Sequence, residues 1–400
     1  MTFNSMGRGA IASMLSLAMG LGLTACSGTY TVGYVYATAA KNTAGLVDGF
    51  KIDYQSGDLT PLADSPVSSG GKNPVTLVAA PNQKALYVVH RDDSNVVFFA
   101  IGTDGKIYPQ NTYNVTGSFP TAAAVDPAGK FLYVTFTYQN GPNGQLYTPA
   151  NPGPGGVAIF PINTDNSLGT PSTFNLGRSP VGITVTKNNF VYVIAQDSAT
   201  AANLFGFSAN SSNGQLTPLP GVTINPGNVV STGYPSGVTP SAIITDSSGS
   251  HLYLSDQGGN QVIGYSIASN GVPSQIGSAQ TDASPAGLTI DVTGSYLYVV
   301  SFTGGSINGF TFGSNGQPVP SKVAGSVQAG TGPTCVSTIG VPNNASPTHA
   351  IYLYTSNQLS NTVTGTQLNP KDGSLIQIQN TPYSASTLPT CLVTVRSFPH

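Results

Sequence analysis

One short motif recurs along the chain and defines its repeat unit. An aliphatic residue, a tyrosine and a second aliphatic residue stand together at six places, and 34–36 is a seventh, degenerate copy. The tyrosines of the full copies are Tyr87, Tyr133, Tyr192, Tyr253, Tyr298 and Tyr352. Their successive spacings are 46, 59, 61, 45 and 54 residues. Periods of this length, filled with short strand-like segments, are typical of the four-stranded blades of a β-propeller.

A proline that opens a short apolar segment precedes each full copy. The tyrosine follows the proline by 12 to 19 residues, and the turn between them is polar, as at 126–130 and 291–295. These prolines are Pro74, Pro120, Pro180, Pro240, Pro285 and Pro333, and Pro389 adds one more near the end. An alternating segment such as 95–101 follows the tyrosine, and a weaker strand ends the unit. We number the four strands of a unit from the expected axis outward and call the first the inner strand.

The order of these strands predicts how the ring closes. We count seven inner and seven second strands, but the chain begins with a second strand (32–37) and finishes with an inner strand (389–395). The last strand must therefore join the first three, which removes the open edges of a linear array. We predict an all-β, seven-bladed β-propeller with one-plus-three closure. Ankyrin-type, tetratricopeptide and leucine-rich repeats need helices or leucine periods, and Trp-Asp repeats need tryptophan, which this sequence lacks.

The composition agrees with a β-rich fold. Charged residues make up 7% of the chain, against roughly 25% in ordinary soluble domains. All 15 acidic residues are Asp, so the residues that usually cover helix surfaces are scarce. The 48 glycines and 30 prolines supply turns, and the 39% hydrophobic fraction supplies a core. A net charge of −2 offers no basic surface for nucleic acid.

The repeat resembles that of a known family. The pattern Pro-x5-Asp-Pro-x-Gly-Lys-Phe-Leu-Tyr-Val at 120–134 is similar to the repeat of bacterial seven-bladed lactonase-type propellers. That group includes 6-phosphogluconolactonases, muconate-cycloisomerase-like proteins and Tyr-Val-Thr-Asn repeat proteins, and the resemblance covers 32–397. It implies the same fold and a lactonase activity. The enzymatic members carry a His-x-His-like segment and several arginines. This sequence has no His-x-His and three mature arginines, Arg91, Arg178 and Arg396, so no catalytic residue carries over by position.

The N-terminal segment predicts export. A single charge, Arg8, precedes an apolar stretch at 11–23, which suits a signal peptide and is too short to span a bilayer. The following Leu-Thr-Ala-Cys resembles a bacterial lipobox, in which Cys26 is acylated; an ordinary secretory signal that happens to end in Cys is the alternative. We expect a signal peptide at 1–25, a tether at 26–31 and the propeller at 32–397. The protein would be lipid-anchored in the cell envelope, at the outer membrane or the periplasmic face.

Cys335 and Cys391 follow Pro-Thr in the inner strands of neighbouring blades. Successive residues of a strand point to opposite faces, and a rotation about the axis maps one cysteine onto the other. The two thiols would then point the same way around the ring instead of converging. We therefore predict that they are not bonded to each other. A disulfide between them is the alternative, because an oxidising compartment permits one.

Candidate functional residues lie on the face where inner strands begin and second strands end, called the top. His90 is the one histidine expected there, and Arg91 and Arg178 flank the same face. In a lactone hydrolase, His90 would act as base and an arginine would stabilise the oxyanion. The candidate ligand-binding residues are Tyr138, Tyr147, Asp197, Tyr234 and Asp256. The long connections 138–155 and 219–239 would form a partial cap or be tolerated insertions.

Other chemistries are not supported by the sequence. Its 4 histidines are dispersed, and it contains no calcium-loop, phosphate-loop or nucleophile-elbow motif. We expect no cofactor, no metal and no nucleic acid, a monomer, and contact with the membrane through the lipid anchor alone. Two functions stay open: a scaffold that binds a small molecule or an envelope protein without catalysis, and a lactone hydrolase.

Overall fold

The computed structural model describes residues 31–40, 44–139, 155–176, 179–198, 201–224, 232–323, 325–340 and 350–397. The regular structure in these ranges is entirely β. No helix there is long and apolar enough to cross a membrane. The anchor residue Cys26 lies outside the described residues.

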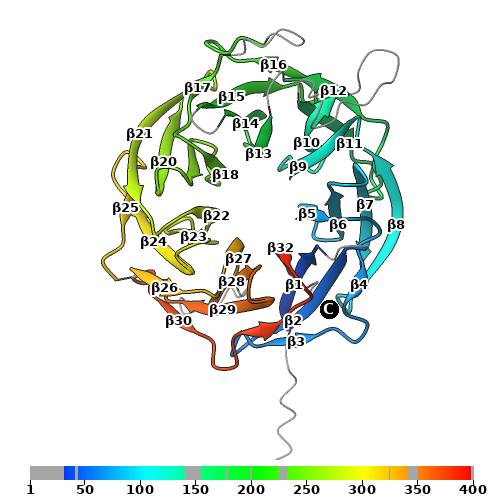
Figure 1. Ribbon diagram of the computed structural model, residues 1–400, viewed down its shortest axis with the longest axis vertical. Coiled ribbons are helices and arrows are strands. Elements are labelled where there is room, and N and C mark those ends of the chain that lie inside the picture. The colour runs from blue at the N-terminus through cyan, green and yellow to red at the C-terminus, as the bar shows by residue number, and fades with distance from the viewer. Residues whose placement is uncertain are drawn as a thin grey trace, which may run out of the picture. The chain divides into compact units, whose positions relative to one another are not determined.

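Seven antiparallel sheets form the fold (Figure 1). The inner strands are β32 (Pro389–Arg396), β5 (Pro74–Ala79), β9 (Gly117–Val125), β13 (Pro180–Val185), β18 (Pro240–Thr245), β22 (Pro285–Ile290) and β27 (Pro333–Gly340). The second strands are β1 (Thr31–Ala39), β6 (Ala85–His90), β10 (Phe131–Gln139), β14 (Phe190–Ser198), β19 (His251–Asp256), β23 (Leu297–Ser301) and β28 (Ile351–Asn357). In this order they belong to blades 1 to 7.

The third strands are β2 (Leu46–Asp53), β7 (Asn95–Ile101), β11 (Gly156–Pro161), β15 (Ala201–Ala209), β20 (Gln261–Ile267), β24 (Ser306–Phe312) and β29 (Thr362–Leu368). Blades 2, 3 and 5 have one outer strand each: β8 (Ile107–Asn114), β12 (Ser172–Asn175) and β21 (Pro273–Gln280). In the other blades two short strands share this place: β3 (Leu59–Pro61) with β4 (Val67–Ser68), β16 (Leu216–Pro218) with β17 (Tyr234–Pro235), β25 (Pro318–Pro320) with β26 (Ser326–Gln328), and β30 (Leu375–Gln377) with β31 (Tyr383–Ser384).

The predicted ring and its closure are confirmed. Each inner strand contacts the inner strands of the two neighbouring blades, and β27, β32 and β5 complete the circle. Strand β1 pairs with β2 on one side and with β32 on the other, so that Tyr36 lies between Gly49 and Val393. Figure 1 shows the last strand beside the first at the inside of one blade. Both ends of the described chain are thereby held in a sheet.

The repeated tyrosine has a structural reason. One buried tyrosine of each second strand donates its hydroxyl hydrogen to a carbonyl in the outer turn of the next blade, because a buried hydroxyl needs a partner. These bonds join Tyr36 to Gly105, Tyr87 to Asn166, Tyr133 to Gly214, Tyr192 to Gly271, Tyr253 to Gly316, Tyr298 to Gly373 and Tyr354 to Gly57. We call them the tyrosine girdle. They lie on the face opposite the top, where the polar turns are. In blade 7 the girdle tyrosine is Tyr354 and not the motif tyrosine Tyr352, whose hydroxyl donates to the carbonyls of Tyr54 and Gln55 instead.

The turns between inner and second strands are held by aspartates, as the polar turn motif suggests. Asp126 accepts hydrogen bonds from the backbone N–H groups of Lys130 and Phe131, at 2.7 and 2.6 Å. Asp291 does the same for the corresponding residues of blade 6. These carboxylates therefore position turns and are occupied within the fold.

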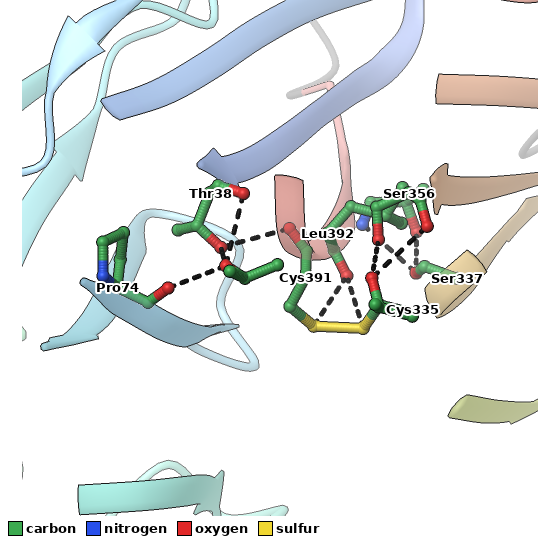
Figure 2. The surroundings of a disulfide bond; sticks show 10 residues. Thr38, Pro74, Cys335, Ser337, Ser356, Cys391 and Leu392 are labelled. Atoms are coloured by element: carbon green, nitrogen blue, oxygen red, sulfur yellow. Dashed lines mark hydrogen bonds between the residues drawn. A yellow bond between two sulfur atoms is a disulfide. The ribbon is translucent and has the colours of Figure 1, made fainter. Parts of the chain in front are cut away.

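Cys335 and Cys391 form a disulfide, so the prediction of two unbonded thiols is wrong (Figure 2). Their Cα atoms lie 4.9 Å apart because inner strands of neighbouring blades approach closely at this level. The register shift between the opening proline and the cysteine occurs in both strands, so the two cysteines keep matching positions, and matching positions on these two inner strands are close enough for the bond.

Candidate functional site

His90 ends its second strand at the top face but is enclosed. Its side chain is fully buried, and its Nε2 lies 2.9 Å from the Oγ of Ser69. Gly71 covers the ring so closely that a Cβ at this position would overlap it. Burial lowers the pKa of His90 to about 4, although Asn95 opposes this shift. The imidazole is therefore neutral at pH 7, a weak base, and out of contact with solvent.

Arg91 follows the last residue of β6 and is exposed. Its guanidinium carbon lies 5.3 Å from the centre of the Phe119 ring, a cation–π arrangement. The Phe119 ring in turn meets Tyr138 edge to face, with centroids 5.5 Å apart. The structure thus links two predicted site residues, Arg91 and Tyr138, through Phe119, which was not among the predicted site residues. We call Arg91, Phe119 and Tyr138 the aromatic rim.

Phe119 could have been found from the repeat. It immediately precedes Pro120, the proline that opens an inner strand, and residues at this position stand at the top of the ring. The equivalent residues are Asn73, Phe119, Ser179, Thr239, Ser284, Gly332 and Leu388. Phe119 has a backbone φ of 56°, in the left-handed region that bulky residues rarely adopt. Phe119 and Leu388 are the two large apolar residues at a position that otherwise holds Asn, Ser, Thr or Gly, so the repeat marks both, and Phe119 is the one with an aromatic ring.

Asp256 and Tyr234 are occupied by the fold. The buried carboxylate of Asp256 accepts hydrogen bonds from the backbone N–H groups of Val238 and Thr239, at 3.0 and 2.8 Å, and from the side chain of Gln261. It therefore holds the connection that enters blade 5. Tyr234 lies on the outer strand β17, and its hydroxyl bonds to the carbonyl of Pro220. The structure does not place either residue in the aromatic rim.

Several predicted site residues lie outside the part that the structure describes. These are Arg178, Tyr147 and the side chain of Asp197. Parts of the two long connections, 140–154 and 225–231, are outside it as well.

The inner strands carry almost no ionisable groups. Apart from the disulfide cysteines, Arg396 at the end of β32 is the single ionisable residue in the seven segments. The remaining inner-strand side chains are aliphatic, aromatic, Ser or Thr. In the described residues no group of three His, Cys, Asp or Glu side chains could hold a metal ion. The inner strands therefore offer van der Waals and hydroxyl contacts, and charged groups stand in the loops and turns at their ends.

Comparisons with known proteins place the chain in a family. A model described as lactonase, 7-bladed β-propeller, matches residues 27–181 and 185–338. No curated protein matches the sequence.

Solved structures share the fold. The periplasmic gluconolactonase of Pseudomonas aeruginosa has a TM-score of 0.68 at 16% identity, covering 92% of this chain and 99% of that one. A Bacteroides fragilis protein provisionally assigned as a 6-phosphogluconolactonase has a TM-score of 0.68 at 18% identity, with coverage of 92% and 99%. A protein from Lactobacillus plantarum has a TM-score of 0.66 at 16% identity, with coverage of 91% and 99%. At this identity the likeness shows the fold alone. Because the family model matches most of its length, this chain belongs to the lactonase family of seven-bladed β-propellers.

Proposed function

We propose that this protein is an exported, lipid-anchored member of the family that binds a ligand at its top face without hydrolysing it. The observation that carries the proposal is the aromatic rim, in which a guanidinium and two aromatic rings meet at the top of blades 2 and 3.

The chemistry of the rim suggests a class of ligand. Aromatic rings accept the apolar face of a small ring, and a guanidinium binds a carboxylate. A sugar acid or a related cyclic acid offers both groups in one molecule. The uncharged inner strands would meet the rest of such a ligand with hydroxyl and aliphatic groups.

Lactone hydrolysis is the second candidate, because the family carries that name. In that function His90 would be the base, and Arg91 or Arg178 would stabilise the oxyanion. The segment at Gly71 would have to move before any substrate reached His90. The low basicity and enclosure of this imidazole favour the binding function.

Export is supported by the disulfide. Bonds of this kind persist in oxidising compartments such as the periplasm, which agrees with the signal segment and with acylation of Cys26. The proposed anchor leaves the propeller in water, and the ligand or an envelope partner would approach from there.

The test is a panel of sugar acids and of sugar and acyl lactones, assayed for binding by calorimetry and for turnover. We expect binding without turnover, and a loss of about tenfold or more in affinity for Phe119→Ser and Arg91→Gln, since each removes one rim contact. Leu359→Ser is the matched control, because Leu359 is an exposed apolar residue in a top-face turn of blade 7. Turnover that disappears in His90→Ala would establish the hydrolase instead. An absence of both binding and turnover would refute both functions.

A further inference from the structure

Hydroxyl groups alternate around the inner ring. In blades 1, 3, 5 and 7 the residue after the opening proline and its neighbour on the second strand both carry a hydroxyl, whereas in blades 2, 4 and 6 neither does. The hydroxyl pairs are Thr390 with Thr38, Thr121 with Thr135, Ser241 with Ser255, and Thr334 with Ser356. The apolar pairs are Val75 with Val89, Val181 with Ile194, and Ala286 with Val300.

Three of these hydroxyls connect one blade to the next. Each donates to the carbonyl of the proline that opens the following inner strand. The bonds run from Thr390 to Pro74 at 2.7 Å, from Thr121 to Pro180 at 2.8 Å, and from Ser241 to Pro285 at 2.7 Å. We call them proline clasps. The even-numbered blades cannot make them because their residues at this position have no hydroxyl.

A ring of seven cannot alternate at every joint. Blade 7 and blade 1 are both hydroxyl blades, and their joint is the place where the chain closes on itself. Thr334 lies 3.0 Å from the hydroxyl of Ser356 and 3.3 Å from its carbonyl, within its own blade. Thr390 and Ser241 make matching contacts within their blades in addition to their clasps, whereas in the described residues Thr334 has no hydrogen bond to the carbonyl of Pro389. One residue further on, the Cys335–Cys391 disulfide makes the connection to blade 1 (Figure 2).

We infer that this disulfide is a redox-sensitive lock on the closing strand β32. It stands in place of a proline clasp at the joint between blades 7 and 1, and it fixes the last strand of the chain to β27. Terminal strands otherwise fray first. Without the lock, β32 is held by hydrogen bonds to β1 and by noncovalent contacts, including the 2.8 Å bond between the hydroxyls of Ser337 and Thr394.

Reduction opens the lock by thiol–disulfide exchange. A thiolate of a small dithiol attacks one sulfur and releases the other cysteine as a thiol, giving a mixed disulfide. The second thiol of the reagent then closes its own ring and frees the remaining cysteine, so one dithiol is oxidised and two cysteine thiols form. Both cysteines are partly exposed, which gives a small reagent access. The lock is independent of the ligand proposed for the top face.

Hydrogen exchange of the full propeller, with Cys26→Ala to remove the third thiol, tests the lock. We expect dithiothreitol to speed amide exchange in β32 and β1 by about tenfold or more. Once the disulfide is reduced, β32 can separate from β1 without staying tethered to β27, so the amides of both strands reach solvent more often. Exchange in β18 and β19 of blade 5, which does not adjoin β32, should not change. The melting temperature should fall by about 5 °C, as expected for loss of a cross-link in a chain of this size.

Two variants control for side effects. The pair Cys335→Ser and Cys391→Ser should exchange like the reduced protein and no longer respond to dithiothreitol. Thr121→Val removes the clasp between blades 3 and 4 but should leave the response of β32 intact. Equal exchange of β32 in oxidised and reduced protein would overturn the inference, as would two free thiols found in denaturant without reductant. Because the main comparison uses chemical reduction, it does not depend on how either variant folds.

Discussion

Tyr354 of blade 7 donates a hydrogen bond of 2.6 Å to the carbonyl oxygen of Gly57 in blade 1. The two residues are 297 positions apart in the sequence, and their bond completes the tyrosine girdle. The Cys335–Cys391 disulfide connects the same two blades nearer the top. The joint at which the chain closes is therefore held by a polar contact on one face and a covalent bond toward the other.

The girdle predicts a stability loss from deleting a single hydroxyl. Tyr354→Phe should lower the free energy of unfolding by about 1–2 kcal/mol, because the carbonyl of Gly57 loses its partner in a buried place. Tyr108→Phe is the control, since the Tyr108 side chain is 48% exposed. Urea unfolding followed by fluorescence measures both. Equal stabilities for the two variants would contradict a role for the girdle.

Removing the closing strand should have a larger effect. A chain that ends before Pro389 lacks β32, so the inner edge of β1 is unpaired and the apolar surfaces of both neighbouring blades are exposed. We expect aggregation or loss of a cooperative transition in calorimetry. A truncated protein that melts like the full-length one would argue against one-plus-three closure.

His90 should make the protein less stable in mild acid. Its pKa is about 4 in the folded state and about 6.5 when unfolded, so between these values the unfolded chain binds more protons. Stability is fully present above pH 6.5 and falls as the pH is lowered toward 4, by up to about 3 kcal/mol. Chemical unfolding across this range should show a steeper loss for the parent protein than for His90→Gln. Parallel curves would mean that His90 is accessible to protons in the fold.

Acylation at Cys26 has a direct test in cells. Cys26→Ala should release the protein from the membrane or block its maturation, because the thiol that carries the lipid is gone. Radiolabelled palmitate should label the parent protein alone. Incorporation into the variant would rule out Cys26 as the acylated residue.

The sequence was enough to predict the architecture. The Pro and Tyr motifs, counted along the chain, give seven blades and place the first and last strands in one sheet, as β1 and β32 show. This works because each blade is a local unit of about 50 residues whose strands pair with their neighbours in sequence. The aspartates of the turns could be assigned for the same reason, since Asp126 bonds to N–H groups four and five residues away.

The candidate site depended on contacts between blades, which the sequence does not show. His90 and Arg91 are adjacent in the chain, yet one is sealed beneath Gly71 and the other stacks on Phe119 of the next blade. Arg91 and Tyr138 were predicted separately from the sequence, but the aromatic ring of Phe119, which joins them, lies on a different strand from either.

The disulfide shows the same limit. Matching positions on two neighbouring strands suggested two thiols that point the same way around the ring and do not meet. The sulfurs meet because the Cα atoms of these two positions lie 4.9 Å apart, a distance that the sequence does not show. The repeated Pro and Tyr motifs of the sequence therefore determined which segments form strands, because strands within a blade pair with their neighbours in the sequence. Only the tertiary structure decided which side chains meet, because the packing of neighbouring inner strands sets the distances between residues that are far apart in the chain.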